Sequence, residues 1–479
     1  MKVLSSIPFI FLISIVCLTQ LSISQKCLEY LRPIYRYETK VVDCPMVSIN
    51  DKRQLIPESN DLMFIINFNC LINDKIMCNK VENVLITAGK FVSATLNLKT
   101  AITIDAQFLN FCLEYGDCDK EKVILGSTRP GRMIPNQDPD GKVRLYPQAL
   151  LKQLQLPEHP EFGSSDILTT FNSNTDYWFE GDPLPSLKNN PDMLYVVVHE
   201  MIHGLGFTTA WRDYFNTQAL TPIPGYFSAT AKGHFLEFIF DKNLVLLPSG
   251  KSLTFFVDEL NKFPIDFVLT ENEFVNLFVK SPQFPVAQNM YKNAITHGAI
   301  GFLITSNLQP NTQLTQDDVF LLETSLVPFQ PGSSVAHVDF ETYFDTSDFL
   351  MMYKYPKISL GQMMAKVGST NTTGPIGPKL RLLLGMLGYE VKKDYIPPVV
   401  LLSSSQSDNE SSFNNTSNTS TNKSNPPKPS NNIEKSDSSL LDMYSNLLCT
   451  FDNVFSIVKL AIDELLYSDN YSTRYSMNS

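Results

Sequence analysis

The chain has 479 residues and a formal net charge of −11 at pH 7, and its 38 Lys and Arg residues form no cluster. This length is sufficient for two or three domains and a sizeable core. The acidic balance gives no sign of a surface built to bind nucleic acid, so no nucleic-acid partner is expected.

The N-terminus, residues 1–24, has the features of a signal peptide. Lys2 precedes an apolar stretch at 7–18, and the small residues of Ser22-Ile-Ser24 come before the expected cleavage point. The apolar stretch is too short for a transmembrane helix. These features predict a secreted, extracellular protein that has no transmembrane span but could associate with the cell surface. Residues 25–60 then form an N-terminal segment that is a candidate propeptide.

Cysteines concentrate early in the expected mature chain. Six of the eight cysteines lie there, at Cys27, Cys44, Cys70, Cys78, Cys112 and Cys118. Behind a signal peptide this number predicts three disulfides. Neighbours in the sequence suggest the pairs Cys27–Cys44, Cys70–Cys78 and Cys112–Cys118, although the pattern allows other connectivities. No C-x-x-C pair is present, which disfavours a zinc cluster. Cys449 is left as a free thiol or a site of intermolecular pairing.

Residues 61–209 are expected to form the upper part of a catalytic domain, with an α/β layer that leads into a metal-binding helix. Short apolar or alternating stretches predict strands at Leu62–Phe68, Ile102–Phe108 and Thr169–Asn174. Apolar residues at helical spacing predict a helix from Lys80 to Leu98. Proline, glycine and aspartate predict a loop from Pro130 to Gly141.

The stretch from Tyr195 to Gly206 contains the motif H-E-x-x-H. On a helix, His199 and His203 lie on the same face and can present two imidazoles to one zinc ion. Glu200 is then placed to act as general base towards a zinc-activated water. The alternative is a chance match on an ordinary helix. An apolar run before the motif and the glycines after it weigh against that alternative, so the motif predicts a zinc hydrolase.

A third protein ligand is needed, because a catalytic zinc takes three and leaves one position open. Most metzincins continue as H-E-x-x-H-x-x-G-x-x-H, and this chain has Thr209 in place of the last histidine. The histidines outside the motif are His159, His234, His297 and His337. His337 has the most favourable setting, after small residues and before a Met-rich segment. His234 and His297 remain alternatives, and Glu237 would be the thermolysin-like choice.

With these residues the chain resembles leishmanolysin-like peptidases, a metzincin group in which an insertion displaces the third histidine. The resemblance covers residues 61–209 and 331–390, through the zinc helix, His337 and Asp348-Phe-Leu350-Met351. It implies an α+β zincin fold and one catalytic Zn²⁺ held by His199, His203 and His337. It also implies a Met-turn whose Met351 forms a floor beneath the metal.

Two residues of the late segment have competing interpretations. Met351 is the expected Met-turn residue, but it is also an ordinary apolar residue in a run that fills a core. Tyr353 lies two residues further on, similar to the tyrosine of astacin-type Met-turns. A phenol there could donate a hydrogen bond to a developing oxyanion, so Tyr353 is a candidate catalytic residue.

The remaining segments complete the expected domain order. Residues 210–330 are expected to form an inserted β-rich module, with strand-like runs at Phe235–Phe240, Leu253–Val257 and Gly298–Ile304. Residues 331–398 form the lower part of the catalytic domain, which closes with a helix at 376–389. Residues 399–439 are a Ser/Asn-rich linker without the apolar residues of a core, and 440–479 an amphipathic C-terminal helix and tail. Candidate glycosylation sites are Asn371, Asn409, Asn414, Asn415, Asn418 and Asn422.

The sequence as a whole predicts a secreted zinc metalloendopeptidase that acts on a peptide or protein substrate. Cleavage of peptide bonds follows from the family resemblance, because H-E-x-x-H alone specifies only metal-assisted hydrolysis. The insert or the C-terminal helix could also contact a surface or a partner. The alternative is a zincin-fold adhesion or recognition protein at the cell surface without significant peptidase activity, which would not require the intact Glu200.

Overall fold

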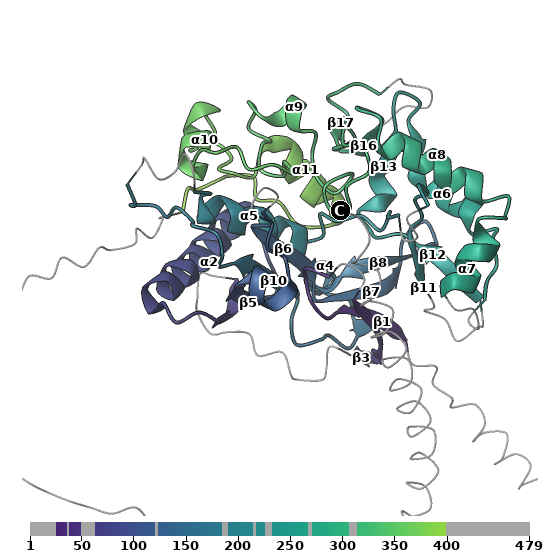
Figure 1. The fold of residues 1–479 in the computed structure, drawn as a ribbon, viewed down its shortest axis with the longest axis horizontal. Coiled ribbons are helices and arrows are strands. Elements are labelled where there is room, and N and C mark those ends of the chain that lie inside the picture. Colours follow the sequence, from purple (N-terminus) through teal and green to yellow (C-terminus); the bar gives the residue numbers. More distant parts are fainter. Residues whose placement is uncertain are drawn as a thin grey trace, which may run out of the picture. The chain divides into compact units, whose positions relative to one another are not determined.

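The computed structural model describes residues 25–35, 38–48, 63–119, 123–183, 190–213, 217–225, 232–266, 271–305 and 314–398. These residues form a mixed α+β fold with several small sheets (Figure 1). The signal peptide, the linker, the C-terminal helix, Cys449 and the five candidate glycosylation sites after position 400 lie outside the described residues. Asn371 lies within them, exposed in a turn.

One four-stranded sheet carries the α/β layer expected before the zinc helix. Its order is β4 (Phe64–Cys70), β5 (Ile102–Leu109), β10 (Ile167–Asn172) and β6 (Gly126–Pro130). The first three strands are parallel, and β6 runs antiparallel to β10 at one edge. Residues Ile102, Ile104, Ala106 and Phe108 of β5 are buried in alternation with more exposed neighbours. The strands predicted near β4, β5 and β10 are therefore confirmed.

Two helices, α2 (Lys75–Thr95) and α5 (Met193–Gly204), pack along each other beside this sheet. The α2 helix begins at Asp74, whose carboxylate accepts a hydrogen bond from the Met77 amide at 3.0 Å. Its buried side chains, Val81, Leu85, Ala88 and Val92, lie on one helical face. The predicted helix is confirmed, but it begins five residues earlier because Asp74 supplies a capping side chain.

A second four-stranded sheet has the order β2 (Thr39–Asp43), β1 (Lys26–Tyr30), β7 (Arg132–Gln137) and β8 (Val143–Pro147). The loop expected at Pro130–Gly141 is therefore wrong in its first part, because β6 ends at Pro130 and β7 runs from Arg132 to Gln137. Pro135 is tolerated within β7 because β1 pairs only with Arg132 and Met133, so no β1 partner is opposite the proline. A two-stranded sheet of β3 (Met46–Ser48) and β9 (Glu158–Pro160) and the helices α3 (Phe111–Tyr115) and α4 (Gln148–Leu154) complete this part.

The insert contains two small sheets and helices. The sheets are β11 (Ile223–Gly225), β12 (Lys232–Leu236), β15 (Ile265–Asp266) and, separately, β14 (Lys251–Ser252), β13 (Leu244–Leu246), β16 (Ile300–Leu303), β17 (Val319–Leu321). The helices are η2 (Asp241–Asn243), α6 (Leu253–Leu260), α7 (Glu271–Phe278) and α8 (Phe284–Ala294). The strand expected at 253–257 is wrong. Ser252 caps this segment as a helix, and its buried residues Leu253, Phe256, Val257 and Leu260 follow helical spacing.

Buried ionic contacts join the insert to the second sheet. The guanidinium of Arg144, which is 1% exposed, contacts the carboxylates of Asp138, Asp140 and Glu237 at 2.6–3.1 Å. Removing the Arg144 guanidinium would leave the buried carboxylate of Glu237 without its cationic partner, which typically costs about 3–5 kcal/mol. The insert is therefore fixed to β8 by a network whose members depend on one another.

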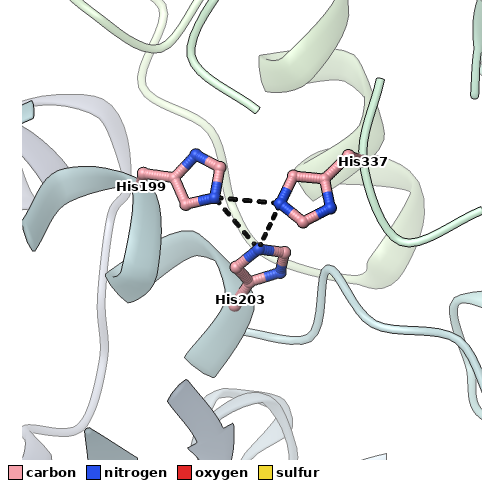
Figure 2. Close-up of side chains that lie close together, drawn as sticks. All are labelled: His199, His203 and His337. Atoms are coloured by element: carbon pink, nitrogen blue, oxygen red, sulfur yellow. Dashed lines mark hydrogen bonds between the residues drawn. The ribbon is translucent and has the colours of Figure 1, made fainter. Parts of the chain in front are cut away.

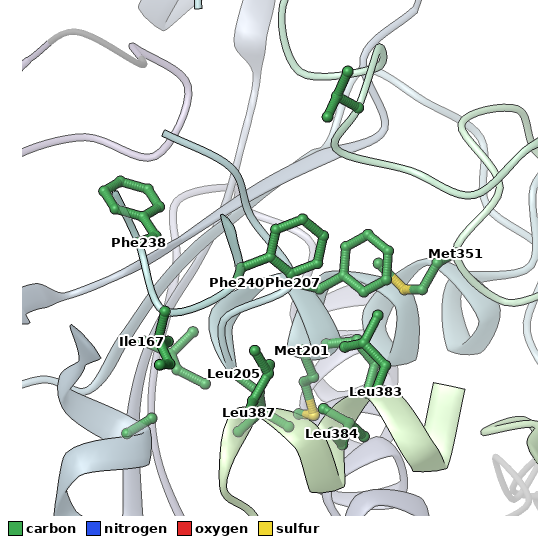
Figure 3. Packing of buried hydrophobic residues seen from close by; sticks show 14 of the residues in the cluster. Ile167, Met201, Leu205, Phe207, Phe238, Phe240, Met351, Leu383, Leu384 and Leu387 are labelled. Atoms are coloured by element: carbon green, nitrogen blue, oxygen red, sulfur yellow. The ribbon is translucent and has the colours of Figure 1, made fainter. Parts of the chain in front are cut away.

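The C-terminal part of the described chain contains α9 (Phe340–Tyr343), α10 (Leu360–Lys366) and α11 (Pro378–Leu387). The start of α11 lacks a capping side chain of its own. Asp348 supplies one from a distant segment, since its Oδ1 accepts from the amides of Lys379 at 2.8 Å and Leu380 at 3.1 Å. Figure 3 shows Leu383, Leu384 and Leu387 of α11 among the buried apolar side chains near Met201 and Leu205.

The three disulfides join Cys27 to Cys44, Cys70 to Cys78 and Cys112 to Cys118, the pairs that sequence proximity suggested. Disulfides indicate an oxidising compartment. Among the described residues, no helix combines the length and apolar character that crossing a membrane requires.

We expect the denatured, unreduced protein, freed of its signal peptide, to expose a single thiol, that of Cys449. The six other cysteines of the mature chain are held in the three disulfides. A thiol-reactive chromophore measures this number, and the same sample after reduction serves as the control. More than one free thiol per unreduced chain would contradict the pairing.

Candidate metal centre

The α5 helix is buried along its whole length and is fixed at its start. Asp192 is the N-cap, with Oδ1 accepting from the Leu194 amide at 2.9 Å and Oδ2 from the Leu360 amide at 2.7 Å. The phenol of Tyr355 accepts from the Asp192 amide at 3.0 Å. These contacts hold the helix against the C-terminal part of the chain. Neither residue was among the sequence expectations. Asp192 directly before an apolar helix is a local N-cap signal that could have identified it, whereas Tyr355 and Leu360 are more than 160 positions away along the chain.

Two glycines allow α5 to end close to its neighbours. A Cβ on Gly204 would lie 2.5 Å from Cγ2 of Ile167 in β10, closer than real atoms approach. Gly206 has a φ of +117°, a backbone conformation that residues with a side chain rarely adopt. A Cβ there would lie 3.0 Å from the Pro147 ring. The glycines predicted to end the helix therefore also permit its approach to β10 and β8.

Three histidines meet where the α5 helix faces the C-terminal part of the chain. The Nε2 atoms of His199 and His203 are 3.1 Å apart, and that of His337 lies 3.1 Å from the first and 3.2 Å from the second. Figure 2 shows the three rings directed at one another. Each of these residues is 8% exposed. Among the described residues, they form a group of side chains that could hold a metal ion.

The second nitrogen of each ring defines how the rings are oriented. Nδ1 of His199 lies 2.8 Å from the Leu350 carbonyl, and Nδ1 of His203 lies 2.7 Å from the Phe207 carbonyl. Nδ1 of His337 is 3.3 Å from the Ser333 carbonyl. A carbonyl only accepts, so the hydrogen of each neutral ring is on Nδ1 and the lone pair is on Nε2. Three lone pairs then face one another without a hydrogen between them, an arrangement that a cation would stabilise.

The geometry fits zinc. Three nitrogens bound at about 2.0–2.1 Å in tetrahedral geometry lie ~3.3 Å from one another. The observed separations of 3.1–3.2 Å are within a few tenths of an ångström of this value. Backbone carbonyls that fix the tautomer of metal-binding histidines are the usual surroundings of such sites. Burial also lowers the pKa of His199 to about 4, which keeps its ring neutral and able to bind a metal.

The segment that contains Met351 supports the site from the C-terminal part of the chain. Besides binding His199, the Leu350 carbonyl accepts a hydrogen bond from the Tyr195 phenol at 3.2 Å. The Val338 amide, next to His337, donates to the Met351 carbonyl at 2.9 Å. Met351 itself is fully buried. The turn thus connects two of the three histidines through its backbone.

Glu200 follows the first histidine and is 8% exposed. It lines a cavity of about 1460 Å³ together with the three histidines, Tyr353 and Gly126. A Cβ on Gly126, the first residue of β6, would lie 3.2 Å from Cγ of Glu200. The absence of a side chain there leaves room for the Glu200 carboxylate beside the strand.

Tyr353 lies at the cavity and is 37% exposed. Its ring packs against Phe340 with centroids 5.9 Å apart. Partial burial is the main cause that raises its pKa, and the carboxylate of Glu323 adds to the effect. The phenol therefore stays protonated at neutral pH, as a hydrogen-bond donor must.

The other candidates for the third ligand lie elsewhere. Thr209 donates to Oδ1 of Asp241 at 2.6 Å, so it anchors the insert to the end of α5. Glu237 binds Arg144, and His297 lies 2.9 Å from Oδ2 of Asp339. His234 lies in β12 of the insert, where it pairs opposite Gly225. His159 stacks on Phe162 with centroids 4.2 Å apart.

We expect Asp348 to make folding stability depend on pH. Burial raises its pKa to about 6, so the folded protein holds this proton more tightly than the unfolded chain, where an aspartate titrates near 3.9. Its stabilising contribution is complete below pH ~4 and is lost as the pH rises through ~6. Asp348→Asn should remove this dependence, on the order of 2 kcal/mol between pH 4 and 7.

Urea unfolding of the metal-free protein at several pH values measures this effect. The asparagine side chain would keep an oxygen for the amides of Lys379 and Leu380, so the substitution removes the charge rather than the cap. Asp345→Asn is the control, because Asp345 is an exposed carboxylate in the same segment. Parallel pH profiles for the parent and Asp348→Asn would contradict the assignment.

Comparison with known proteins identifies relatives without a described activity. A family model described as SPBPB7E8-like matches residues 25–433. The chain is 27% identical over 382 residues to "Uncharacterized protein PB7E8.01" of Schizosaccharomyces pombe, an alignment that covers 71% of this chain. It spans 65% of the length of that relative. No solved structure matches. Neither description names a reaction.

Proposed function

Since the chain belongs to the SPBPB7E8-like family, for which no activity is described, we propose from the site that it is a secreted zinc metalloendopeptidase of the leishmanolysin-like type. The observation that carries this proposal is the convergence of three Nε2 lone pairs beside Glu200. His199, His203 and His337 would hold one Zn²⁺ and leave a coordination position open towards the cavity.

The protein's own residues account for the proton transfers. A zinc ion held at the three histidines would supply Lewis acidity to a peptide carbonyl and to a water molecule. Glu200, which lines the cavity, would take a proton from the attacking water and return it to the leaving amine. Tyr353 donates a hydrogen bond to the oxygen that becomes negatively charged. Burial of the site strengthens each of these electrostatic interactions.

An extended peptide is the substrate class that suits the cavity. Strand β6 pairs with β10 along one edge, and no described strand pairs along its other edge. Val123, Ile124 and Leu125 lead into Gly126, the first residue of β6, and all four line the cavity that contains Glu200. A peptide could add to this edge as a further strand, which fixes its backbone by main-chain hydrogen bonds whatever its side chains. This arrangement supports cleavage of peptide bonds over hydrolysis of a small ester or amide.

Secretion is part of the proposal. Its support is the signal-peptide pattern at the N-terminus, together with the three disulfides of the described residues. The sequons and the C-terminal segment would then lie outside the cell, where glycosylation of the linker and contacts to a surface are expected.

Metal analysis and digestion of an unfolded protein substrate test the function together. The purified protein should contain about one zinc per chain and degrade the substrate. A chelator should abolish the degradation, and added zinc should restore it. Zinc without any hydrolysis would favour the adhesion or recognition alternative, and absence of a bound metal would contradict the proposal.

A further inference from the structure

The β1–β2 hairpin extends along the same edge that a substrate strand would use. Its strands pair from Lys26 opposite Asp43 to Tyr30 opposite Thr39, and the disulfide between Cys27 and Cys44 closes their open end. Beyond the paired strands, the Leu31 amide donates to the Glu38 carbonyl at 3.0 Å. The described residues at the tip of this hairpin are Arg32 to Tyr35, which we call the hairpin tip.

The hairpin tip continues a pairing that begins in the second sheet. Leu28 and Glu29 of β1 lie opposite Met133 and Arg132 of β7, and the Tyr30 amide donates to the Gly131 carbonyl at 3.3 Å. Gly131 separates β7 from the end of β6. A chain that leaves β1 in this direction therefore passes Gly131 and approaches β6.

A hydrogen bond places the hairpin tip against strand β6. The hydroxyl of Ser127 in β6 donates to the Pro33 carbonyl at 2.9 Å. Pro33 is buried, and the next residue, Ile34, lines the cavity that contains Glu200 and the three histidines. Ser127 follows Gly126, the residue beside Glu200. Within β6, the residue that contacts the hairpin tip is thus the direct neighbour, one strand rise of ~3.3 Å away, of the residue beside the general base.

Three further features hold the hairpin tip in place. The Arg32 guanidinium pairs with Glu38, through Nε to Oε2 at 2.6 Å, and lies 4.4 Å from the centre of the Tyr35 ring. Tyr35 in turn packs edge-on against Tyr115 of α3, with ring centroids 5.5 Å apart. Cys27 and Tyr30 are almost fully buried. The hairpin is consequently part of the core at its base and constrained at its tip.

We propose that the hairpin tip is a specificity determinant that closes one end of the substrate strand site. This inference rests on the proposed peptidase function. Val123 to Gly126 line the cavity, but at Ser127 the hairpin tip lies against β6 and would block an added strand from continuing. The preferred substrates are therefore chain ends and short peptides that project only one or two residues past the reacting bond on the closed side.

A nested series of labelled peptides tests this proposal without requiring hydrolysis. Binding is measured by fluorescence anisotropy to the zinc-loaded Glu200→Gln protein, with each peptide extended in steps at its N-terminal or its C-terminal end. Extension at one end should leave the affinity unchanged. Extension at the other end should weaken binding about tenfold after one or two residues, equivalent to the loss of one or two hydrogen bonds.

Two substitutions at Ile34 connect the length limit to the hairpin tip. Ile34→Ala should reduce the loss of affinity that extension on the closed side causes, and Ile34→Trp should increase this loss. The parent and both variants should bind the shortest peptide equally. Leu31→Ala is the matched control, because Leu31 lies in the same hairpin but is 56% exposed and does not line the cavity. Thiol counting shows that each variant retains its disulfides.

The outcomes separate this inference from the proposed function. Length-dependent binding that responds to Ile34, in a parent protein that hydrolyses none of the peptides, would support the hairpin tip and reject the peptidase. Hydrolysis or binding that is equally tolerant of extension at both ends would overturn the inference and leave the peptidase intact. Absence of binding by every peptide, or a penalty that Ile34 variants do not change, would also overturn it.

Discussion

Glu200→Gln is expected to retain zinc and to hydrolyse a peptide substrate about 10²-fold or more slowly than the parent. Glutamine matches glutamate in size, so the buried surroundings of residue 200 and the Gly126 contact should remain. The amide cannot accept the proton that the mechanism transfers, which removes general-base catalysis worth about 10²–10⁴-fold. The three histidines are unchanged, and with them the affinity for the metal.

The measurements are the turnover of an internally quenched peptide and the zinc content of the same samples. The control is Glu180→Gln, which changes an exposed glutamate that precedes α5. It should leave both quantities near the parent values. If the Glu200→Gln protein hydrolyses the peptide as fast as the parent, Glu200 is not the general base and the proposed mechanism fails.

His337→Ala is expected to lower zinc affinity by at least about 10²-fold. Its Nε2 supplies the third corner of the triangle at 3.1–3.2 Å from the other two nitrogens. Removing it leaves two imidazoles and an incomplete shell for an ion that takes at least three protein ligands in a catalytic site. Nearby Thr209 cannot replace it, because its hydroxyl is bound to Asp241.

A competition with a zinc chelator measures this affinity in four proteins. The parent, His234→Ala and His297→Ala should compete alike, since neither histidine belongs to the group of possible ligands among the described residues. His337→Ala should release zinc at a much lower chelator concentration. Equal retention by the His337→Ala protein would exclude it as a ligand, and loss in either control variant would transfer the third ligand to the insert.

Local spacing was sufficient to predict the half of the site that lies on α5. His199 and His203 are four residues apart, and helical periodicity places such residues on one face whatever surrounds them. The disulfide pairs also follow from proximity, because the loops that they close are short. The alternating residues of β5 predicted its strand for the same reason.

The third histidine of the site and parts of the fold depend on contacts between segments that are distant in the chain. His337 is 134 residues from His203, and no periodicity relates such positions. The sequence favoured His337 only through its setting and a family resemblance, and the fold brings the two rings together. Tertiary contacts also show that Thr209 and Glu237 lie outside the histidine group. Thr209 is hydrogen-bonded to Asp241, and Glu237 is hydrogen-bonded to Arg144. In the insert, the run at 253–257 has apolar residues that suit a strand or a helix, and the Ser252 cap and tertiary burial selected the helix.

The hairpin tip shows most clearly what tertiary structure alone decided. Nothing in the residues near Ile34 indicates a catalytic neighbour, and the stretch resembles an ordinary turn between two strands. Its position depends on β1 pairing with β7, a contact between residues about one hundred positions apart, such as Glu29 with Arg132. The local pattern of a strand specifies which face is buried but not which strand it joins, because that choice depends on the complementarity of the whole fold.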